Sequence, residues 1–445
     1  MKVNDTIIYI AQDYANAETV GRVDGYTVFV PQMIVGERAR VKINHVKGNV
    51  AYGTVAELLE VSDKRVQPQC KHFGKCGGCA LMHMCYSEQL LFKQNKVAAN
   101  LKKIAKIDAE VLPCVPSEKT CGYRNKLSLP VSGICGNVHV GMYERNSHKV
   151  VETRGCRLGG DWAEKLVHVF TQYCNEYGIV PYCELNFTGE VRHLVARYVD
   201  GQLLVTVVAN GELCKNLTPF AEKLAQNFTK FGLFVNINTY KNNVILGKVT
   251  RHICGLKYIE GTHLGVKFRL RPNSFFQVND GVKDAIYTRV RELLDLSQTE
   301  VLVDCFSGIG ILTNALASVD YDTYAIEIEP SAIEDANEMA RMNMSPRVHN
   351  VCGDVNVELP KIVEAHKGKR FTIVVDPPRK GLGAGICETL MKSNADNIVY
   401  ISCDSATLAR DLATLSHMYT VAYVQPFDMF PHTDQVETLV CLKKR

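Results

Sequence analysis

The chain has 445 residues, of which 46% are hydrophobic and 22% are charged, and its formal net charge is +4. A chain of this length exceeds one compact core, so we expect two or three domains. It contains no apolar run of the roughly 18 residues that a membrane-spanning helix requires, which excludes a membrane partner. The mild net charge excludes an overall basic field, so nucleic-acid binding would depend on local patches.

The seventeen cysteines are the most unusual part of this composition. The N-terminal residues lack the apolar stretch of a secretory signal, so we expect a cytoplasmic protein. Disulfides rarely persist in that compartment. The cysteines therefore predict reduced thiols, a metal cluster or catalysis.

Residues 1–60 have the pattern of a small β unit. The segments 26–30 and 38–43 are rich in β-forming residues, and glycines and prolines separate them. Five short strands in this length fit an OB-like barrel, a fold that commonly binds RNA. On pattern alone, a β cap without a ligand explains the segment equally well.

Three closely spaced cysteines follow, Cys70, Cys76 and Cys79. They can converge on one metal centre because the adjacent glycines, Gly77 and Gly78, allow tight turns. A mononuclear zinc site is the direct competitor, although it usually shows two CxxC pairs or a histidine pair. A fourth ligand would come from afar, and Cys156 is the best candidate. Weaker candidates for this fourth ligand are Cys85, Cys121 and Cys135.

Residues 85–106 show apolar side chains at helical spacing, and the pattern predicts a helix. Leu90, Leu91 and Val97 would lie on its buried face, and lysines, among them Lys93 and Lys96, would point outward. Such a basic face is usually only solvated, but it would also suit a phosphate backbone. Beyond it, strands around 203–209, 233–238 and 243–247 predict a central β-rich domain.

From about residue 260 the pattern becomes an alternation of strands and helices, which favours a doubly wound, Rossmann-like sheet. The expected division is 1–60, 61–260 and 261–445, with the 85–106 helix free to pack on the last part. Strands are predicted at 299–303, 322–326, 371–375, 397–402 and 419–424.

A strand, a glycine turn and a helix succeed one another around Gly308 and Gly310. Glycines let the backbone approach a ligand there, although Thr313 replaces the third glycine of a dinucleotide fingerprint. Glu327 closes the next strand, where an acid can hold ribose hydroxyls. Asp354 could face an adenine edge. An acid at the glycine turn, Asp304, suits a cationic amino-acid tail, so S-adenosylmethionine is favoured over NAD.

Cys403 ends an apolar strand, and Glu437 follows on an expected loop. Uracil C5 is a poor nucleophile until a thiolate adds at C6, and a base must later remove the C5 proton. A cysteine and a glutamate supply those two roles. Either residue alone is more often a packed or a solvated side chain, and the motif that begins at Asp376 strengthens the functional interpretation. Cys305 is the rival nucleophile, but it lies in the cofactor turn.

The motifs together resemble the RNA (uracil-5-)-methyltransferase family over almost the whole chain, in its ribosomal-RNA branch that carries an iron–sulfur cluster. The specific runs are SFFQVN at 274–279, SCDSATLARD at 402–411 and FPHTDQVE at 430–437. The chain departs from the family pattern at Ser307, Asp404 and Gln435, where the family often has cysteine, asparagine and histidine. These departures affect fine points such as base orientation and exact substrate.

The resemblance implies roles for particular residues. It implies an N-terminal TRAM domain, a central iron–sulfur domain, Cys403 as the nucleophile and Glu437 as the base. The implied ligands of a 4Fe–4S cluster are Cys70, Cys76, Cys79 and Cys156, and the implied cofactor contacts are Gln277, Phe306, Glu327 and Asp376.

The implied reaction is methylation of a uridine in 23S ribosomal RNA to 5-methyluridine, with S-adenosylmethionine as the methyl donor. The base must be extruded to reach Cys403, at a cost of a few kcal/mol. We expect RNA and not DNA as the partner, a monomer, and a structural cluster. Three alternatives are the same chemistry on the T-loop of transfer RNA, a non-catalytic RNA-binding protein, and adenine N6 methylation, which would leave the thiol unemployed.

Overall fold

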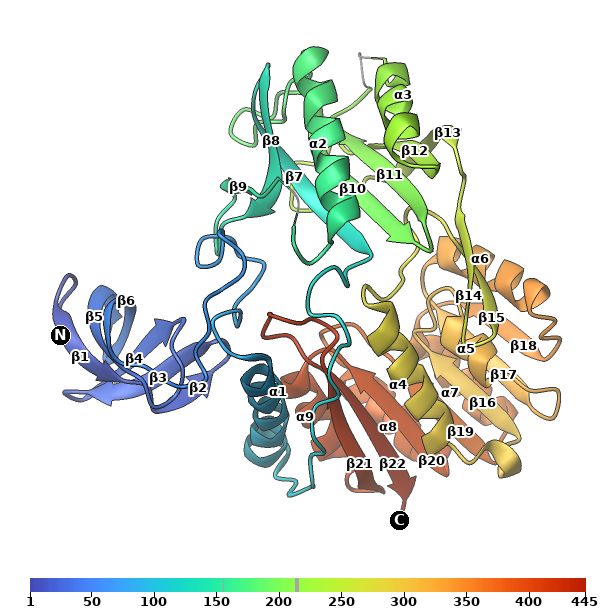
Figure 1. Cartoon of the computed structure of the whole chain (residues 1–445). Helices are drawn as coiled ribbons and strands as arrows, with labels where there is room; N and C mark the ends of the chain where they lie inside the picture. Colours follow the sequence, from blue (N-terminus) through green and yellow to red (C-terminus); the bar gives the residue numbers. More distant parts are fainter. Residues whose placement is uncertain (155, 213–215) are drawn as a thin grey trace.

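The computed structural model describes residues 1–154, 156–212 and 216–445, and it shows three sheet-based parts arranged as separate lobes (Figure 1). The N-terminal lobe contains strands only, the described residues of the middle lobe form a sheet with two helices, and the C-terminal lobe is a sheet covered by helices. The predicted α/β class is therefore confirmed. In the described part of the chain, no helix is long and apolar enough to cross a membrane.

The N-terminal sheet has six strands in the order β1-β5-β6-β4-β3-β2, one more strand than the sequence predicted. Inward and outward residues alternate along β5, where Ala39, Val41 and Ile43 are buried between exposed neighbours. These side chains pack on Tyr9 and Val28 in the core of the lobe. Its strands are β1 (Thr6–Ile10), β2 (Asp13–Ala15), β3 (Glu18–Val23), β4 (Tyr26–Pro31), β5 (Arg38–Lys47) and β6 (Val50–Glu60).

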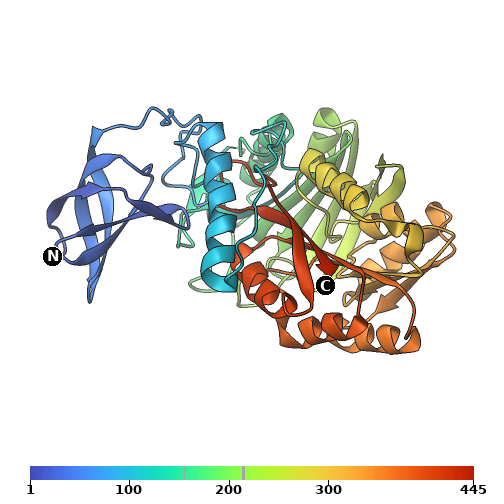
Figure 2. The ribbon, with the colours of Figure 1, turned by 90° about the horizontal axis from the view of Figure 1, so that it is seen from below.

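Helix α1 (Tyr86–Asn100) and the π-helical turn that follows it (Leu101–Ala105) pack on the C-terminal lobe, although they come from the first quarter of the sequence. Figures 1 and 2 both show α1 beside α9. The predicted faces of this helix are partly wrong. Lys93 is fully buried, whereas Leu91 is 47% exposed, because the lobe presents polar partners to α1 as well as apolar ones.

The middle lobe is a seven-stranded sheet in the order β13-β12-β11-β10-β7-β8-β9. Helices α2 (Asp161–Glu176) and α3 (Thr218–Asn227) pack on it and share its core. The strand predicted at 243–247 is absent from this described segment, and the edge strand begins at Val249 instead. The strands are β7 (Lys126–Ile134), β8 (Asn137–Tyr143), β9 (Val150–Glu152), β10 (Val191–Val199), β11 (Gln202–Ala209), β12 (Lys230–Ile237) and β13 (Val249–Gly255).

A hairpin and a helix lead from the middle lobe into the C-terminal sheet, whose order is β18-β17-β16-β19-β20-β22-β21. The five predicted strands are present with small shifts of their ends, and the sequence missed the fully formed last strand. The elements are β14 (Ile259–His263), β15 (Val266–Leu270), α4 (Asp280–Leu293), a 3-10 turn (Leu296–Gln298), β16 (Val301–Cys305), α5 (Ile311–Leu316), β17 (Asp322–Glu327), α6 (Pro330–Met342), β18 (Val348–Cys352), α7 (Val355–Ala365), β19 (Phe371–Val375), α8 (Gly383–Ser393), β20 (Asn397–Ser402), α9 (Ser405–Leu415), β21 (Tyr419–Phe427) and β22 (Glu437–Lys444).

Both faces of this sheet are covered, which explains its continuous apolar strands. Val301 and Val303 of β16 pack in the core that α7, α8 and α9 complete. Leu302, between them, packs in the core on the other side with α4 and α5. The five strands β16 to β20 are parallel to one another, whereas β22 runs antiparallel to both of its neighbours. The strand order reverses next to β16, and ligands of such sheets bind at the carboxyl ends of the strands at that point.

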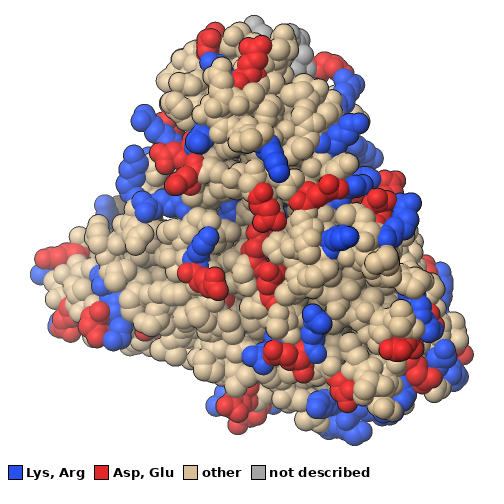
Figure 3. Space-filling view, turned by 45° about the vertical axis from the view of Figure 1, so that its right-hand side comes forward, with Lys and Arg blue, Asp and Glu red and all other residues tan. Residues whose placement is uncertain are grey.

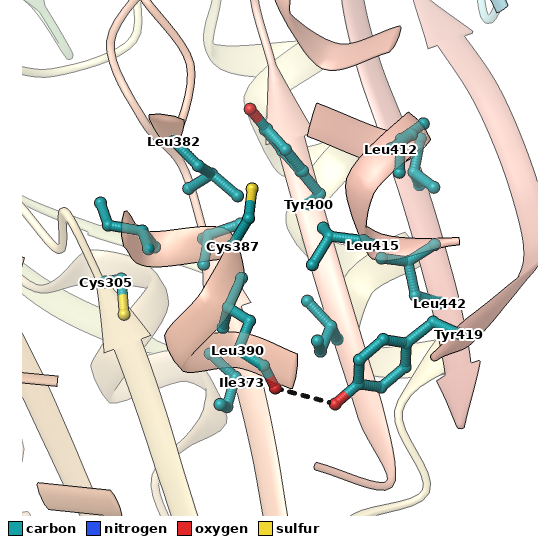
Figure 4. Close-up of a cluster of buried hydrophobic side chains, with 14 of the residues drawn as sticks. Cys305, Ile373, Leu382, Cys387, Leu390, Tyr400, Leu412, Leu415, Tyr419 and Leu442 are labelled. Carbon is teal, nitrogen blue, oxygen red and sulfur yellow. Dashed lines mark hydrogen bonds between the residues drawn. The ribbon is translucent and has the colours of Figure 1, made fainter. Parts of the chain in front are cut away.

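Figure 4 shows the core beneath α8 and α9, to which Leu390, Leu412 and Tyr419 contribute. The Tyr419 hydroxyl donates a hydrogen bond to the Leu390 carbonyl over 3.0 Å. This core supports strand β20 and the first turn of α9, and it therefore fixes the end of the sheet that carries the candidate site.

We predict that Leu412→Ala lowers the free energy of unfolding by about 2–5 kcal/mol, because it leaves a cavity in a fully buried core. Urea denaturation followed by circular dichroism measures this change. Leu185→Ala is the matched control, since Leu185 is 94% exposed, and its effect should stay within about 0.5 kcal/mol. Equal losses for both variants would contradict the packing described for α9.

Candidate active site and a four-cysteine cavity

A cavity of about 640 Å³ lies at the carboxyl ends of the central strands of the C-terminal sheet. This volume is in the range of small-molecule and cofactor sites. The segments after β16, β17, β19 and β20 contribute to its wall, together with residues 275–277 and 430–437. It brings together all six residues that the sequence proposed for catalysis and cofactor binding: Gln277, Phe306, Glu327, Asp376, Cys403 and Glu437.

The glycine turn after β16 folds into the wall of this cavity through left-handed backbone conformations. Phe306 has φ +65°, and Gly308 and Gly310 have φ +56° and +82°. The Gly308 amide donates a hydrogen bond to Glu327 Oε2 over 3.0 Å, and the Glu329 amide donates to Oε1 over 2.9 Å. These bonds fix the Glu327 carboxylate, whose remaining lone pairs are available to hydroxyl donors in the cavity.

The structure corrects the interpretation of Asp304. This residue lies inside β16, is buried, and is not among the described residues that line the cavity. Its carboxyl accepts a hydrogen bond of 2.5 Å from Thr313 Oγ1, and burial raises its pKa to about 7. Asp304 therefore joins the strand to α5 and does not face a ligand. Asp354, in contrast, lines the cavity as expected.

Cys305, the rival nucleophile, is fully buried at the end of β16 in the core shown in Figure 4. It is not among the described lining residues of the cavity. Burial raises its pKa well above that of an ordinary thiol. Its position is that of a small apolar core residue.

The pairing of β20 with β22 places Cys403 and Glu437 at the same point of the sheet edge. Ser402 lies opposite Thr438 in this antiparallel ladder, so the next residues outward are Cys403 and Glu437. Both line the cavity. Glu437 is the first residue of β22 and not a loop residue as predicted, which gives its backbone a fixed direction.

Burial and mutual repulsion dominate the electrostatics of this corner. Burial raises the pKa of Glu437 well above its ordinary value. The charge of the nearby Asp376 raises this pKa further, whereas the charge of Arg379 lowers it. Burial, followed by the charges of Glu437 and Asp376, raises the pKa of Cys403 to about 11, and Arg379 opposes this shift. The resting site therefore holds a neutral thiol beside a carboxyl group that is an unusually strong base.

Hydrogen bonds from α9 hold the loop that follows Asp376. Thr407 Oγ1 donates to the Arg379 carbonyl over 3.1 Å, and the Arg410 guanidinium donates to the Lys380 carbonyl over 2.8 Å. Because α9 begins two residues after Cys403, the nucleophile and this loop are positioned by one helix.

Two acidic side chains anchor α9 itself. Asp404 caps the helix and accepts hydrogen bonds from the amides of Ala406 and Thr407 over 3.0 and 2.9 Å. Asp411 accepts from the Tyr400 hydroxyl and from the Leu382 amide, both over 2.8 Å. The residue after Cys403 thus has a helix-capping role that aspartate fills as well as asparagine.

The sequence did not single out several side chains that line the cavity. Lys283 and Tyr287 lie one turn apart on α4, and Lys283 Nζ is 2.9 Å from Asp284 Oδ1. Their helical spacing four residues apart, just after the SFFQVN run, was the available signal. Phe275, in that run, is 67% exposed at the same cavity. Lys380 is a further lining residue that the sequence missed, whereas Phe430 and Gln435, which also line the cavity, belong to the 430–437 run named above.

A second cavity, of about 260 Å³, is lined by all four cysteines proposed as cluster ligands: Cys70, Cys76, Cys79 and Cys156. Its described lining includes none of the weaker candidates Cys85, Cys121 and Cys135. Within the described ranges, no group of three or more His, Cys, Asp or Glu side chains is arranged to hold a metal ion. The iron–sulfur cluster therefore stays a prediction.

The two cavities share a wall. Val278 lines the cysteine cavity, and Gln277, its neighbour, lines the other cavity. Asn125 holds both residues, since its amide N–H donates to the Val278 carbonyl and its side chain donates to the Gln277 carbonyl, each over 2.9 Å. The cysteine segment, far from Cys403 in sequence, is thus next to the candidate active site in space.

Comparison with known proteins identifies the family. Residues 85–445 match the tRNA (Uracil-5-)-methyltransferase family, and residues 11–56 match the TRAM domain. An "uncharacterized RNA methyltransferase" of Clostridium acetobutylicum is 36% identical, over 100% of this chain and 98% of its own length. Another, of Halalkalibacterium halodurans, is 34% identical, over 99% and 97%.

Among solved structures, the tRNA (uracil-54, C5)-methyltransferase of Pyrococcus abyssi, in complex with S-adenosyl-L-homocysteine, superposes with a TM-score of 0.77. It is 25% identical, and the match covers 98% of this chain and 100% of that one. Family match, full-length relatives and superposition agree. This chain belongs to the tRNA (uracil-5-)-methyltransferase family of SAM-dependent RNA (uracil-C5)-methyltransferases.

Proposed function

We propose that this enzyme methylates C5 of a uridine in 23S ribosomal RNA, with Cys403 as nucleophile and Glu437 as base. The observation that carries the proposal is the register of β20 and β22, which places Cys403 and Glu437 side by side in the wall of one cavity. The same cavity contains the residues proposed for cofactor binding. A thiol, a basic carboxyl group and a nearby methyl-donor site are the components that this chemistry requires.

The proposed donor, S-adenosylmethionine, fits the polar groups of the cavity. Glu327 would accept hydrogen bonds from ribose hydroxyls, and Asp354 would accept from the adenine edge. Phe306 would contact the cofactor with its ring, while Gln277 and Asp376 would orient it near Cys403. The Pyrococcus abyssi relative in complex with S-adenosyl-L-homocysteine supports this assignment. When bound, the donor supplies a methyl group on a sulfonium, which is strongly electrophilic.

In the proposed reaction, the Cys403 thiol first loses its proton to solvent, and the resulting thiolate adds to C6 of uracil and moves an electron pair toward C5, forming an enolate. C5 then bonds to the methyl carbon, and the carbon–sulfonium bond breaks with its electron pair on sulfur. Glu437 takes the C5 proton, and the electron pair left at C5 restores the double bond and expels Sγ from C6. The raised pKa of Glu437 makes its carboxylate a better acceptor for that proton.

The RNA must present an extruded base to this cavity. Phe275, Arg379 and Lys380 are exposed around it, and they would stack on a base and contact phosphates. On the face shown in Figure 3, Lys and Arg side chains lie among Asp and Glu side chains. Binding would therefore rely on such local groups together with the N-terminal TRAM domain.

We also propose that Cys70, Cys76, Cys79 and Cys156 hold a 4Fe–4S cluster. The cavity that these four thiols line supports the assignment. Such a cluster would tie the 70–79 segment to the segment around Cys156, and its role would be structural. The combination of four thiolates with a TRAM domain favours ribosomal RNA as the substrate.

A second candidate substrate is the T-loop of transfer RNA. The observation in its favour is the solved relative, which acts on uracil 54 of tRNA and superposes over the full chain. The same two residues would perform the same chemistry, so only the RNA-binding surfaces would differ.

Incubation of anaerobically purified enzyme with S-adenosylmethionine and unmodified 23S rRNA should produce 5-methyluridine, detected by nucleoside mass spectrometry. Cys403→Ala should produce none, because addition at C6 is lost. Product in tRNA alone would assign the enzyme to the second substrate. An absence of 5-methyluridine in both RNAs would refute the uracil mechanism.

The raised pKa of Cys403 predicts a steep pH dependence of its alkylation. At pH values below its pKa of about 11, the thiolate fraction of Cys403 should rise about tenfold per pH unit. The rate of its reaction with iodoacetamide should rise by the same factor between about pH 7 and pH 10. Peptide mass spectrometry follows Cys403 separately from the other cysteines. A rate that levels off near pH 8.5, the range of an ordinary thiol, would contradict the buried site described above.

Replacement of one proposed cluster ligand should remove the metal. Purified anaerobically, the wild-type enzyme should contain iron and sulfide matching one cluster per chain, whereas Cys79→Ser should contain little and should unfold at a lower temperature. Cys135→Ser is the matched control, because Cys135 is exposed and outside the described lining of the cavity. Wild-type protein without iron, or equal loss from both variants, would overturn the assignment.

A further inference from the structure

Helix α1 directs four polar side chains at one segment of the C-terminal lobe. Tyr86, Gln89, Lys93 and Lys96 are spaced three or four residues apart and so share one face of the helix. Each of them donates or accepts a hydrogen bond with the 428–434 segment. This segment joins β21 to β22 and leads directly to Glu437.

The centre of this contact is a buried ion pair between Lys93 and Asp428, whose side chains are both 0% exposed. Lys93 Nζ also donates to the Phe430 carbonyl over 3.0 Å, and the Tyr86 hydroxyl donates to Asp428 Oδ2 over 2.8 Å. Burying two charges gains little net stability, whereas removing one partner leaves the other charge buried without a partner. We therefore interpret the pair as a device that fixes geometry.

Hydrogen bonds also hold the second half of the 428–434 segment. His432 is in the left-handed region with φ +68°. Its amide donates to Gln89 Oε1 over 3.0 Å, and its carbonyl accepts from the amides of Ala80 and Leu81 over 2.9 Å each. Lys96 Nζ donates to the Asp434 carbonyl over 2.8 Å. The path from Asp428 to Glu437 is thus held at successive points by residues from the N-terminal quarter of the chain.

We propose that Lys93, assisted by Gln89 and Lys96, is a positioning residue for the approach of Glu437 to the C5 proton. The inference rests on the proposed function, because it takes Glu437 as the base. None of these three side chains is among the described lining of the cavity, so they act through the 428–434 segment. Cys403 is placed by β20 and α9 instead, whereas the hydrogen bonds of Lys93 go to Asp428 and Phe430, so the addition and methyl-transfer steps depend less on Lys93.

This division of labour has a distinctive kinetic consequence. A displaced segment slows proton removal and elimination more than it slows the steps before them. The methylated RNA then stays covalently bound to Cys403, and the adduct accumulates during turnover. A loss of folding or of RNA binding would instead lower adduct and product together.

The experiment compares Lys93→Met and Lys96→Met with the control Lys103→Met and the reference Glu437→Gln. Lys103 is exposed in the turn after α1, and no hydrogen bond or ion pair joins its side chain to another described residue. Single-turnover reactions with the RNA that the wild-type enzyme methylates are quenched in denaturant. Denaturing gels then quantify the RNA–protein adduct, and nucleoside mass spectrometry quantifies free product.

Displacement of a catalytic group by about 1 Å can cost on the order of 100-fold in rate, so Lys93→Met should slow elimination by about 10- to 100-fold and accumulate adduct. Lys96→Met should shift both measurements in the same direction by less, and Lys103→Met should match the wild-type enzyme. Glu437→Gln should accumulate adduct to the greatest extent.

The outcomes separate this inference from the proposed function. If Glu437→Gln traps no adduct while still losing product, the assignment of Glu437 as base is refuted. If Glu437→Gln traps adduct but folded Lys93→Met and Lys96→Met behave like Lys103→Met, or lose adduct and product in proportion, the positioning role is overturned. Should Lys93→Met not fold, Lys96→Met and Gln89→Met decide the question by the same two measurements.

Discussion

The antiparallel pairing of β22 with β20 is the constraint on which the active site depends. The parallel strands β16 to β20 are joined by helices, so they deliver residues to the cavity from their carboxyl ends. Strand β22 runs the other way and delivers its first residue, Glu437, next to Cys403. A parallel last strand would place its amino end at the opposite edge of the sheet. The reversal of one strand therefore allows nucleophile and base to share a corner.

That reversal makes the β21–β22 connection a structural problem, because its residues are buried or half-buried without a strand partner and their peptide groups must find other hydrogen bonds. The solution comes from outside the lobe. Helix α1 supplies Lys93 and Gln89, and the segment after Cys79 supplies two amides to the His432 carbonyl. Asn125, just before the first strand of the middle lobe, likewise fixes Gln277. The three lobes thus do not divide the work into binding and catalysis, since parts before residue 130 complete the catalytic site.

Sequence patterns predicted the site residues whose position follows from the local succession of strands and helices. They failed for residues whose position depends on partners that are distant in sequence. Glu327, Asp376 and Cys403 each follow an apolar strand, so the carboxyl-end rule for parallel sheets places them together. Lys93 was placed outward because helical periodicity treats a lysine among apolar residues as solvated. Its burial depends on partners that are distant in sequence, Asp428, 335 residues away, and the Phe430 carbonyl. The prediction for Asp304 was wrong for another reason. Strand β16 extends one residue beyond Asp304, so the carboxyl group lies within the strand and points into the interior.

Holding the 428–434 segment also sets the electrostatics of the base. The pKa of Glu437 is raised first by burial, which lasts only while the segment excludes water from the carboxyl group. If the segment moved outward, water would solvate the carboxylate and lower its pKa toward the ordinary value. A carboxylate of ordinary pKa is a weaker base for a carbon-bound proton. Position and basicity thus have one cause, and the contacts between α1 and the segment govern both.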